Sequence, residues 1–298
     1  MDRKLHLVYI PVTGVGIFSG FRGLDWFKYR LEIFKNYTLK SLVNQDSNHW
    51  ILWLSFRPEE AGHPYLDELS EFIKQKGIKC IMTFDGLMYW DDKFAKELFP
   101  RLKNLARIIR KGCRERDFSN LLTGAKEIFK NKNRSLPQRL RKSLAHLADR
   151  LGTDWDWVYM TRIDSDDMFH CEYLNKVISC QPFLGALTLH TGYVFDAKTK
   201  SLGEWVPKTN PPFYTVIFPR GAFFDPVLHL RYYDGYRSHE DIPLIFDTRI
   251  LPDFNYLVLT HSIQNQISTT PNHPFRREIQ DLTAREKEEI LKDFGING

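Results

Sequence analysis

Three apolar stretches alternate with two amphipathic stretches over the first 84 residues, and this order constrains the fold more than any other feature. Residues 5–10, 50–56 and 78–84 are rich in branched and aromatic side chains and predict strands. Residues 27–42 and 66–73 carry apolar side chains at helical spacing. Alternating strands and helices are typical of a parallel sheet covered on both faces.

The second half of the chain predicts a mixed continuation of this sheet. Further strands are expected at residues 157–160, 184–190, 193–195, 215–218 and 255–260. Their irregular spacing, with intervening proline and glycine, favours a partly antiparallel half. A capping box at residues 282–286 predicts a last helix, ending near Phe294, in the C-terminal segment 275–298. We therefore predict an α/β fold with a Rossmann-like mixed sheet flanked by helices.

A basic segment interrupts the pattern of strands. Residues 101–150 contain fifteen Lys or Arg and four Asp or Glu, a net charge of +11 that leaves −6 for the rest of a chain whose total is +5. We interpret residues 96–152 as a basic helical insertion, with its second helix opening at Pro137 and closing before Gly152. Such a segment can contact nucleic acid, a lipid surface or an acidic glycan, or it can be a solvated helical face.

The longest apolar runs, such as residues 49–56, are far shorter than the roughly 20 residues of a transmembrane helix. We therefore expect no transmembrane segment. The N-terminus lacks the pattern of a signal peptide. The four cysteines show no Cys-x-x-Cys spacing, which favours reduced, buried thiols over disulfides or a zinc site. These features predict a cytoplasmic protein.

Asp164, Asp166 and Asp167 place three carboxylates within four residues, directly behind the strand predicted at 157–160. Crowded anions at the end of a buried strand are unfavourable unless a cation neutralises them. Alternate carboxylates lie on one side of an extended chain, and oxygen ligands suit Mg²⁺ or Mn²⁺. The alternative is a turn in which Asp166 and Asp167 cap a helix starting near Met168.

Two later features add polar groups of the same kind. Glu240 and Asp241 precede an apolar run at residues 242–246, where a carboxylate could remove a proton from an acceptor hydroxyl or could only cap a helix. His261 ends the strand predicted at 255–260 and offers a nitrogen ligand beside the aspartates, unless its role is structural.

In chain order, these motifs resemble the four-part signature of metal-dependent glycosyltransferases of the GT-A fold. The series is Asp164-Ser165-Asp166, Gly221, His239-Glu240-Asp241 and His261. Further motifs are similar to proteins assigned as rhamnosyltransferases. They are Arg30-Leu31-Glu32-Ile33-Phe34, Thr38-Leu39-Lys40-Ser41-Leu42, Gln45, Trp50-Ile51-Leu52-Trp53 and Thr161-Arg162-Ile163-Asp164-Ser165-Asp166-Asp167. The resemblance covers most of residues 1–95 and 155–270. It departs at Ser55-Phe56-Arg57-Pro58, where such proteins commonly have an aspartate after the second strand.

The resemblance implies one GT-A-like catalytic domain over residues 1–298. This domain would transfer a hexose or deoxyhexose from a nucleotide-sugar donor to an acceptor hydroxyl with inversion. Asp241 would be the general base, with Glu240 beside it. Mn²⁺ or Mg²⁺ would be held by Asp164, Asp166 and His261. The donor would be contacted by Asp164, Asp85, Gly221 and Arg162.

The acceptor stays open between a glycan, a lipid-linked molecule and a nucleic acid. One alternative is a glycosyltransferase that modifies bases in DNA through the basic insertion, since closely spaced Lys and Arg can follow a phosphate backbone. Another is a non-catalytic module that binds a nucleotide or nucleic acid.

Overall fold

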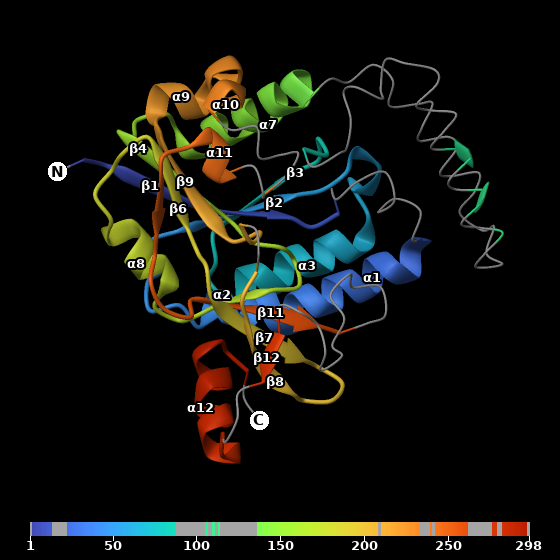
Figure 1. The fold of residues 1–298 in the computed structure, drawn as a ribbon. Coiled ribbons are helices and arrows are strands. Elements are labelled where there is room, and N and C mark those ends of the chain that lie inside the picture. Colours follow the sequence, from blue (N-terminus) through green and yellow to red (C-terminus); the bar gives the residue numbers. More distant parts are fainter. Residues whose placement is uncertain are drawn as a thin grey trace.

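The computed structural model describes residues 2–13, 23–87, 105–106, 109–110, 113, 136–207, 210–232, 239, 242–261, 276–278 and 282–296. The described residues form two sheets with helices packed against them (Figure 1). The predicted α/β fold with a mixed sheet flanked by helices is confirmed.

The main sheet has seven strands in the order β10-β6-β9-β4-β1-β2-β3. Its strands are β1 (Lys4–Pro11), β2 (Ile51–Ser55), β3 (Cys80–Thr83), β4 (Trp157–Arg162), β6 (Gly185–Thr188), β9 (Tyr214–Pro219) and β10 (Thr248–Ile250). Strands β1 to β4 are mutually parallel, whereas β9 runs antiparallel to β4 and β6. The prediction of a parallel first half and a partly antiparallel second half is therefore confirmed.

Helices cover both faces of this sheet (Figure 1). One face packs against α1 (Gly23–Ile33), the π-helical segment Phe34–Thr38, α2 (Leu39–Val43) and α3 (Pro64–Gln75). The other packs against α7 (Leu136–Leu151) and α9 (Arg220–Phe224), with α10 (Pro226–Tyr232) and α11 (Ile242–Ile245) beside them. Short α8 (Tyr173–Ser179) packs into the same core as α1 through Tyr173, Leu174 and Val177.

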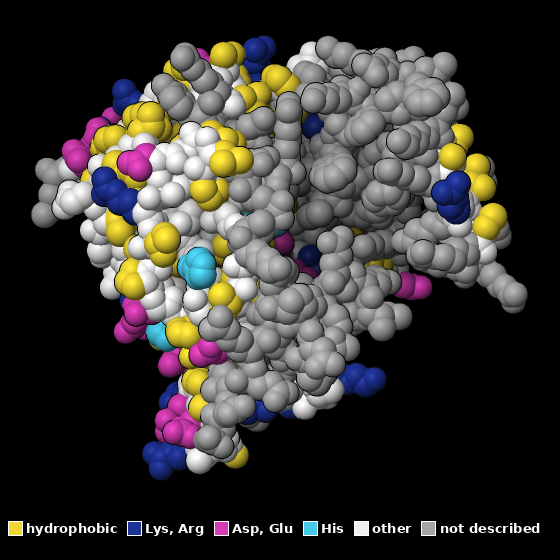
Figure 2. Space-filling model, viewed as in Figure 1, with side chains coloured by type: hydrophobic (Ala, Val, Ile, Leu, Met, Phe, Trp, Pro, Cys, Tyr) yellow, Lys and Arg dark blue, Asp and Glu magenta, His cyan; other side chains and the backbone are white. Residues whose placement is uncertain are grey.

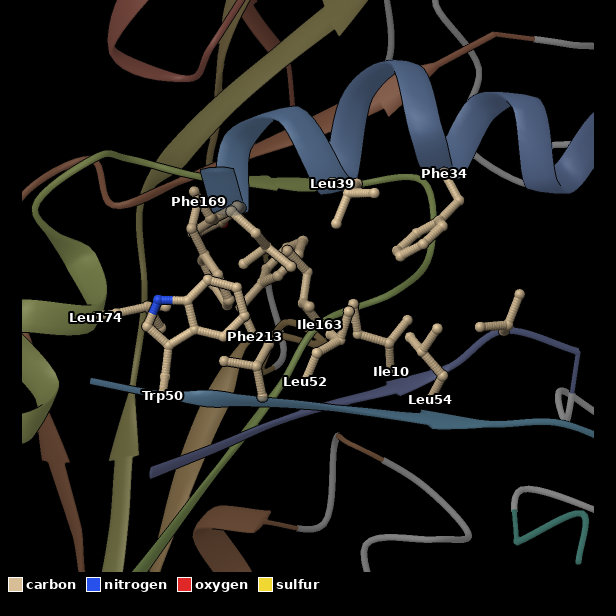
Figure 3. Packing of buried hydrophobic residues seen from close by; sticks show 14 of the residues in the cluster. Ile10, Phe34, Leu39, Trp50, Leu52, Leu54, Ile163, Phe169, Leu174 and Phe213 are labelled. Carbon is tan, nitrogen blue, oxygen red and sulfur yellow. The ribbon is translucent and has the colours of Figure 1, made fainter. Parts of the chain in front are cut away.

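The alternation of side chains along β1 explains the two layers. Leu7 and Tyr9 pack in the core on the α7 side, while Val8 and Ile10 pack on the α1 side. Successive side chains of a strand point to opposite faces, so a strand buried on both sides is apolar throughout. Figure 3 shows part of the α1-side core, where Phe34 and Leu39 face residues of the sheet such as Ile10, Leu52 and Leu54.

A second sheet has the order β12-β8-β7-β11-β5. It consists of β5 (Met168–Phe169), β7 (Gly192–Asp196), β8 (Leu202–Trp205), β11 (Tyr256–Thr260) and β12 (Arg276–Glu278). We expected β7 and β11 as parts of one continued sheet, and this was wrong. Hydrophobic spacing predicts a strand but not its neighbour in a sheet.

The last helix, α12 (Ala284–Asp293), packs against the second sheet through Leu291 and the following Phe294. The predicted capping box is confirmed: Glu286 N donates to Thr283 Oγ1 at 3.2 Å, and Thr283 N donates to Glu286 Oε2 at 2.8 Å. The C-terminal segment 275–298 is not purely helical, because β12 pairs with β8.

Most of the predicted insertion at 96–152 lies outside the described residues. Its second helix is confirmed as α7, and Gly152 follows it with a φ of +71°. A positive φ directly after a helix favours glycine, which explains where this helix ends. Arg141, Lys142 and Arg150 are exposed on α7. Each helix in the described ranges is too short or too polar to cross a lipid bilayer.

Candidate functional site

The three aspartates follow β4 at the edge of the main sheet where β1, β2 and β3 also end. Asp167 N donates to Asp164 O at 3.3 Å, which closes a tight turn. The next two residues form β5, and α8 begins only at Tyr173. The helix-capping interpretation of Asp166 and Asp167 is therefore wrong. In open α/β sheets this edge is where ligands bind.

Asp166 is the carboxylate with the most partners in this turn. Arg30 of α1 donates from Nη1 to Oδ2 at 2.5 Å and from Nη2 to Oδ1 at 3.0 Å. Nε2 of His261 lies 3.2 Å from Asp166 Oδ2. The three side chains are only 5% to 15% exposed. Burial alone raises the pKa of Asp166, but Arg30 and His261 outweigh it and lower the pKa to about 2.

His261 follows β11 and is held from its other side. The hydroxyl of Tyr29 lies 3.2 Å from both Nδ1 and the carbonyl oxygen of His261. Tyr29 can therefore donate its proton to the carbonyl while it accepts the Nδ1 hydrogen. In this tautomer Nε2 could bind a cation, whereas a hydrogen on Nε2 would donate to Asp166 Oδ2 when no cation is present. Metal-binding histidines commonly donate their second N–H in this way.

Asp164 has a different partner. Arg162, at the end of β4, donates from Nη2 to Asp164 Oδ1 at 2.8 Å and from Nη1 to Pro212 O at 2.9 Å. The arginine is buried, whereas the side chain of Asp164 is 28% exposed. Arg162 was predicted to contact the donor, and this stays a prediction; its contact with Asp164 orients that carboxylate.

Asp167 is buried beside β11, and its Oδ1 accepts from Leu259 N at 3.0 Å. Burial, together with the charges of Asp166 and Asp164, raises the pKa of Asp167 well above its ordinary value. This contact ties the acidic turn to the second sheet. Asp167 is thus a structural residue of the turn.

The donor set of Asp166 and His261 fits a divalent cation. Two neighbouring ligands of an octahedral ion at about 2.1 Å lie about 3.0 Å apart, close to the 3.2 Å separation of Oδ2 and Nε2. Asp164 does not join them in a compact three-ligand group; in the described part of the chain such a group is formed by His170, Cys171 and Asp293. A cavity of about 280 Å³ next to α12 includes His170 and Asp293 in its lining but none of the predicted site residues.

The other predicted donor contacts lie apart from this pair. Asp85 follows β3 on the same edge of the sheet, and its Oδ2 accepts from Ser143 Oγ at 2.8 Å. Gly221 lies in α9 beyond the opposite end of β9, because Pro219 pairs with Trp157 at the start of β4. The length of β4, about 17 Å, therefore separates Gly221 from the acidic turn. This placement does not support a shared site for Gly221.

The predicted base, Asp241, and its neighbour Glu240 lie outside the described residues. His239 of the same motif is described, and its Nδ1 lies 2.6 Å from Asn210 O. Asn210 Nδ2 in turn donates to His239 O at 3.0 Å.

Three residues at this edge were not predicted as site residues. Arg30 and Tyr29 are neighbours in α1, and no spacing in the sequence connects them with Asp166 or His261. Glu60 follows β2, and its Oε2 accepts from Arg57 N at 3.0 Å and from the hydroxyl of Thr13. Glu60 thus brings a carboxylate close to the position where the resemblance led us to expect an aspartate.

Acidic and basic side chains also lie deep in a hollow near the middle of the face in Figure 2.

No protein-family model matches this sequence, and no curated protein matches it. Among solved structures, the chain is similar to residues 1–349 of TarS from S. aureus, with 12% identity, a TM-score of 0.40, and coverage of 98% of this chain and 70% of that chain. For the same TarS fragment in complex with UDP, the identity is 11%, the TM-score 0.35 and the coverage the same.

A protein of Desulfovibrio desulfuricans G20 assigned as a nucleotide-diphospho-sugar transferase is also similar, with 12% identity, a TM-score of 0.35, and coverage of 86% of this chain and 82% of that chain. At these TM-scores the likeness supports no conclusion about activity. The functional conclusion therefore depends on the residues of the site.

Proposed function

We propose that this protein is a GT-A-type glycosyltransferase that moves a sugar from a nucleotide-sugar donor to an acceptor hydroxyl with the help of Mn²⁺ or Mg²⁺. The proposal depends on the contact between Asp166 and His261. This contact lies at the edge of the main sheet where four parallel strands end. An oxygen and a nitrogen ligand at this edge suit a cation that also binds a diphosphate. Asp164, held by Arg162, is proposed as a further contact for the cation or donor.

The order of the strands in the main sheet suggests how the donor would lie along the edge of the sheet. The diphosphate would lie beside Asp166 at the end of β4, and the nucleoside would extend toward Asp85 at the end of β3. These strand ends are three strand spacings apart, about 14 Å. Glu60 and Thr13 lie along this path, after β2 and β1, and would contact the nucleoside.

The proposed reaction is a direct displacement. The acceptor oxygen attacks the anomeric carbon of the sugar, and the bond from that carbon to the diphosphate oxygen breaks with inversion. Asp241 would take the proton of the acceptor hydroxyl, with Glu240 positioning the acceptor. A bound divalent cation would offset the charge that develops on the leaving diphosphate. Arg162 orients Asp164 beside the site that this cation would occupy.

The proposal is tested by incubating the protein with a panel of nucleotide sugars and Mn²⁺ and measuring release of the nucleoside diphosphate. We expect hydrolysis of at least one donor, its loss on chelation with EDTA, and its return when Mn²⁺ is added back. Metal-dependent binding of a nucleoside diphosphate without turnover of any donor would instead favour a non-catalytic module. Mass analysis with glycan, lipid-linked and DNA acceptors then identifies the product.

A further inference from the structure

Arg30 is the counter-ion that holds Asp166 in this structure. Its two terminal nitrogens each donate to one carboxylate oxygen, and its Nε donates to Ser165 Oγ at 2.8 Å. Bidentate pairs of this kind are among the strongest in proteins. The ion pair is also largely shielded, because the two side chains are 15% and 13% exposed.

The same carboxylate oxygen serves two different partners. Asp166 Oδ2 accepts from Arg30 Nη1, and it faces the ring nitrogen of His261 at 3.2 Å. A divalent cation bound between Asp166 and His261 would therefore lie against the guanidinium. Like charges at such a distance, in a site with little water, repel strongly. A divalent cation bound at Oδ2 would therefore compete with Arg30 for the same carboxylate oxygen.

We propose that Arg30 is a resident counter-ion that a divalent cation displaces from Asp166, and that the displaced guanidinium then binds the donor's diphosphate. This inference rests on the proposed function. Arg30 also contacts Ser165 of the same turn through Nε, so a guanidinium that leaves Asp166 starts beside the acidic turn. The planar guanidinium fork matches two phosphate oxygens as well as it matches two carboxylate oxygens.

The exchange couples the two ligands. Both the cation and the diphosphate favour the state in which Arg30 has left Asp166, so each increases the affinity of the protein for the other. Without a diphosphate, the cation must compete with Arg30 and binds weakly. Arg30 therefore prevents the cation site from filling fully before the donor is present.

The direct test is calorimetric titration of Mn²⁺ alone into the full chain. Arg30→Gln removes the competitor, and we expect its Mn²⁺ affinity to be at least about tenfold higher than that of the wild type. The matched control Arg285→Gln removes an exposed arginine that pairs with Glu289, and it should leave the affinity unchanged. Equal Mn²⁺ affinities of wild type and Arg30→Gln, or no Mn²⁺ binding by either protein, would overturn the exchange.

Inorganic pyrophosphate tests the second half of the proposal. In the presence of Mn²⁺, Arg30→Gln should bind pyrophosphate about tenfold more weakly than the wild type, although its Mn²⁺ affinity is higher. Opposite changes for the two ligands are not expected of a residue that is only structural. Unchanged pyrophosphate affinity would overturn the assignment of Arg30 as a diphosphate contact.

Two further variants guard against misfolding as an explanation. Arg30→Lys keeps the positive charge but loses the fork, so its Mn²⁺ affinity should lie between those of wild type and Arg30→Gln. In Arg30→Gln combined with Asp166→Asn, the gain in affinity should disappear. If the wild type hydrolyses a donor but Arg30→Gln does not change the affinity for Mn²⁺, only this inference is overturned. If the affinities change as predicted but no donor is hydrolysed, only the proposed function is overturned.

Discussion

Asp166 and His261 are 95 residues apart in the sequence, yet Oδ2 of the aspartate lies 3.2 Å from Nε2 of the histidine. The pairing of β5 with β11 explains this contact. After Asp167 the chain leaves the main sheet and forms β5, which runs antiparallel to β11, with Met168 opposite Leu257. The residues before Met168 therefore lie alongside the end of β11, which is followed by His261.

This relationship predicts that His261→Ala weakens the binding of Mn²⁺. The substitution removes one of the two adjoining ligands and leaves Asp166 paired with Arg30, so we expect a loss of at least about tenfold in affinity. Calorimetric titration measures it. His49→Ala is the control, because His49 is exposed and makes no contact with the acidic turn. Equal losses in both variants would show that His261 is not a ligand.

Asp167 should tolerate replacement by asparagine but not by an apolar residue. Asp167→Asn keeps an acceptor for Leu259 N and cannot take on the negative charge that burial and two neighbouring carboxylates disfavour, so the free energy of unfolding should not fall. Asp167→Leu leaves that buried N–H without its acceptor and should cost about 1–3 kcal/mol. Urea unfolding followed by circular dichroism compares the two. A loss in Asp167→Asn as large as in Asp167→Leu would contradict this role.

Stability should depend on pH through His6. This residue is buried in β1 with Nε2 2.8 Å from Thr161 Oγ1, and burial lowers its pKa to about 3. The unfolded chain binds a proton at about pH 6.5 and the folded chain does not. Stability is therefore highest above pH 6.5 and falls by about 1.4 kcal/mol per pH unit for this group as the pH drops from 6.5 toward 3.

The measurement is the free energy of unfolding at pH 7.0 and 5.5 for the wild type and for His6→Gln. The glutamine keeps a polar partner for Thr161 but does not titrate, so its free energy of unfolding should fall by about 1.3 kcal/mol less than that of the wild type between pH 7.0 and pH 5.5. His229 is also buried, and burial lowers its pKa to about 4. Its effect on the pH dependence of stability is the same in both proteins. An identical pH dependence in the two proteins would show that burial does not lower the pKa of His6 in the folded state.

The docking of the last helix should depend on its cap. Thr283→Ala removes the hydroxyl that accepts from Glu286 N, and we expect a loss of about 1 kcal/mol in the free energy of unfolding. Thr283→Ser keeps the hydroxyl and should cost much less. Thermal unfolding of the three proteins gives the comparison, and equal losses in both variants would point to the methyl group rather than the cap.

Local features of the fold could be predicted from the sequence because they depend on neighbouring residues. The strands β1 to β3, the end of α7 at Gly152 and the cap at Thr283 follow from spacing, glycine and capping chemistry. The second sheet could not be predicted, because apolar periodicity does not specify which strand pairs with β11.

The same limit applies to the site. The acidic turn and His261 could each be predicted as polar groups at the end of a strand, but their contact depends on the pairing of β5 with β11 in the second sheet. The contact of Arg30 with Asp166 depends on how α1 packs over the sheet, and it joins residues 136 positions apart. Gly221 has the position in the sequence that the glycosyltransferase signature predicts. Because β9 runs antiparallel to β4, however, Gly221 lies at the edge of the main sheet opposite the acidic turn.

The most direct test of the central claim is the rate at which wild type and Asp166→Asn release nucleoside diphosphate from a nucleotide sugar in the presence of Mn²⁺. Asparagine keeps the shape of the side chain and removes the negative charge that would hold the cation. The account predicts turnover of at least one donor by the wild type and a rate at least about 100-fold lower in the variant. Equal rates in the two folded proteins, or no turnover of any donor by the wild type, would contradict it.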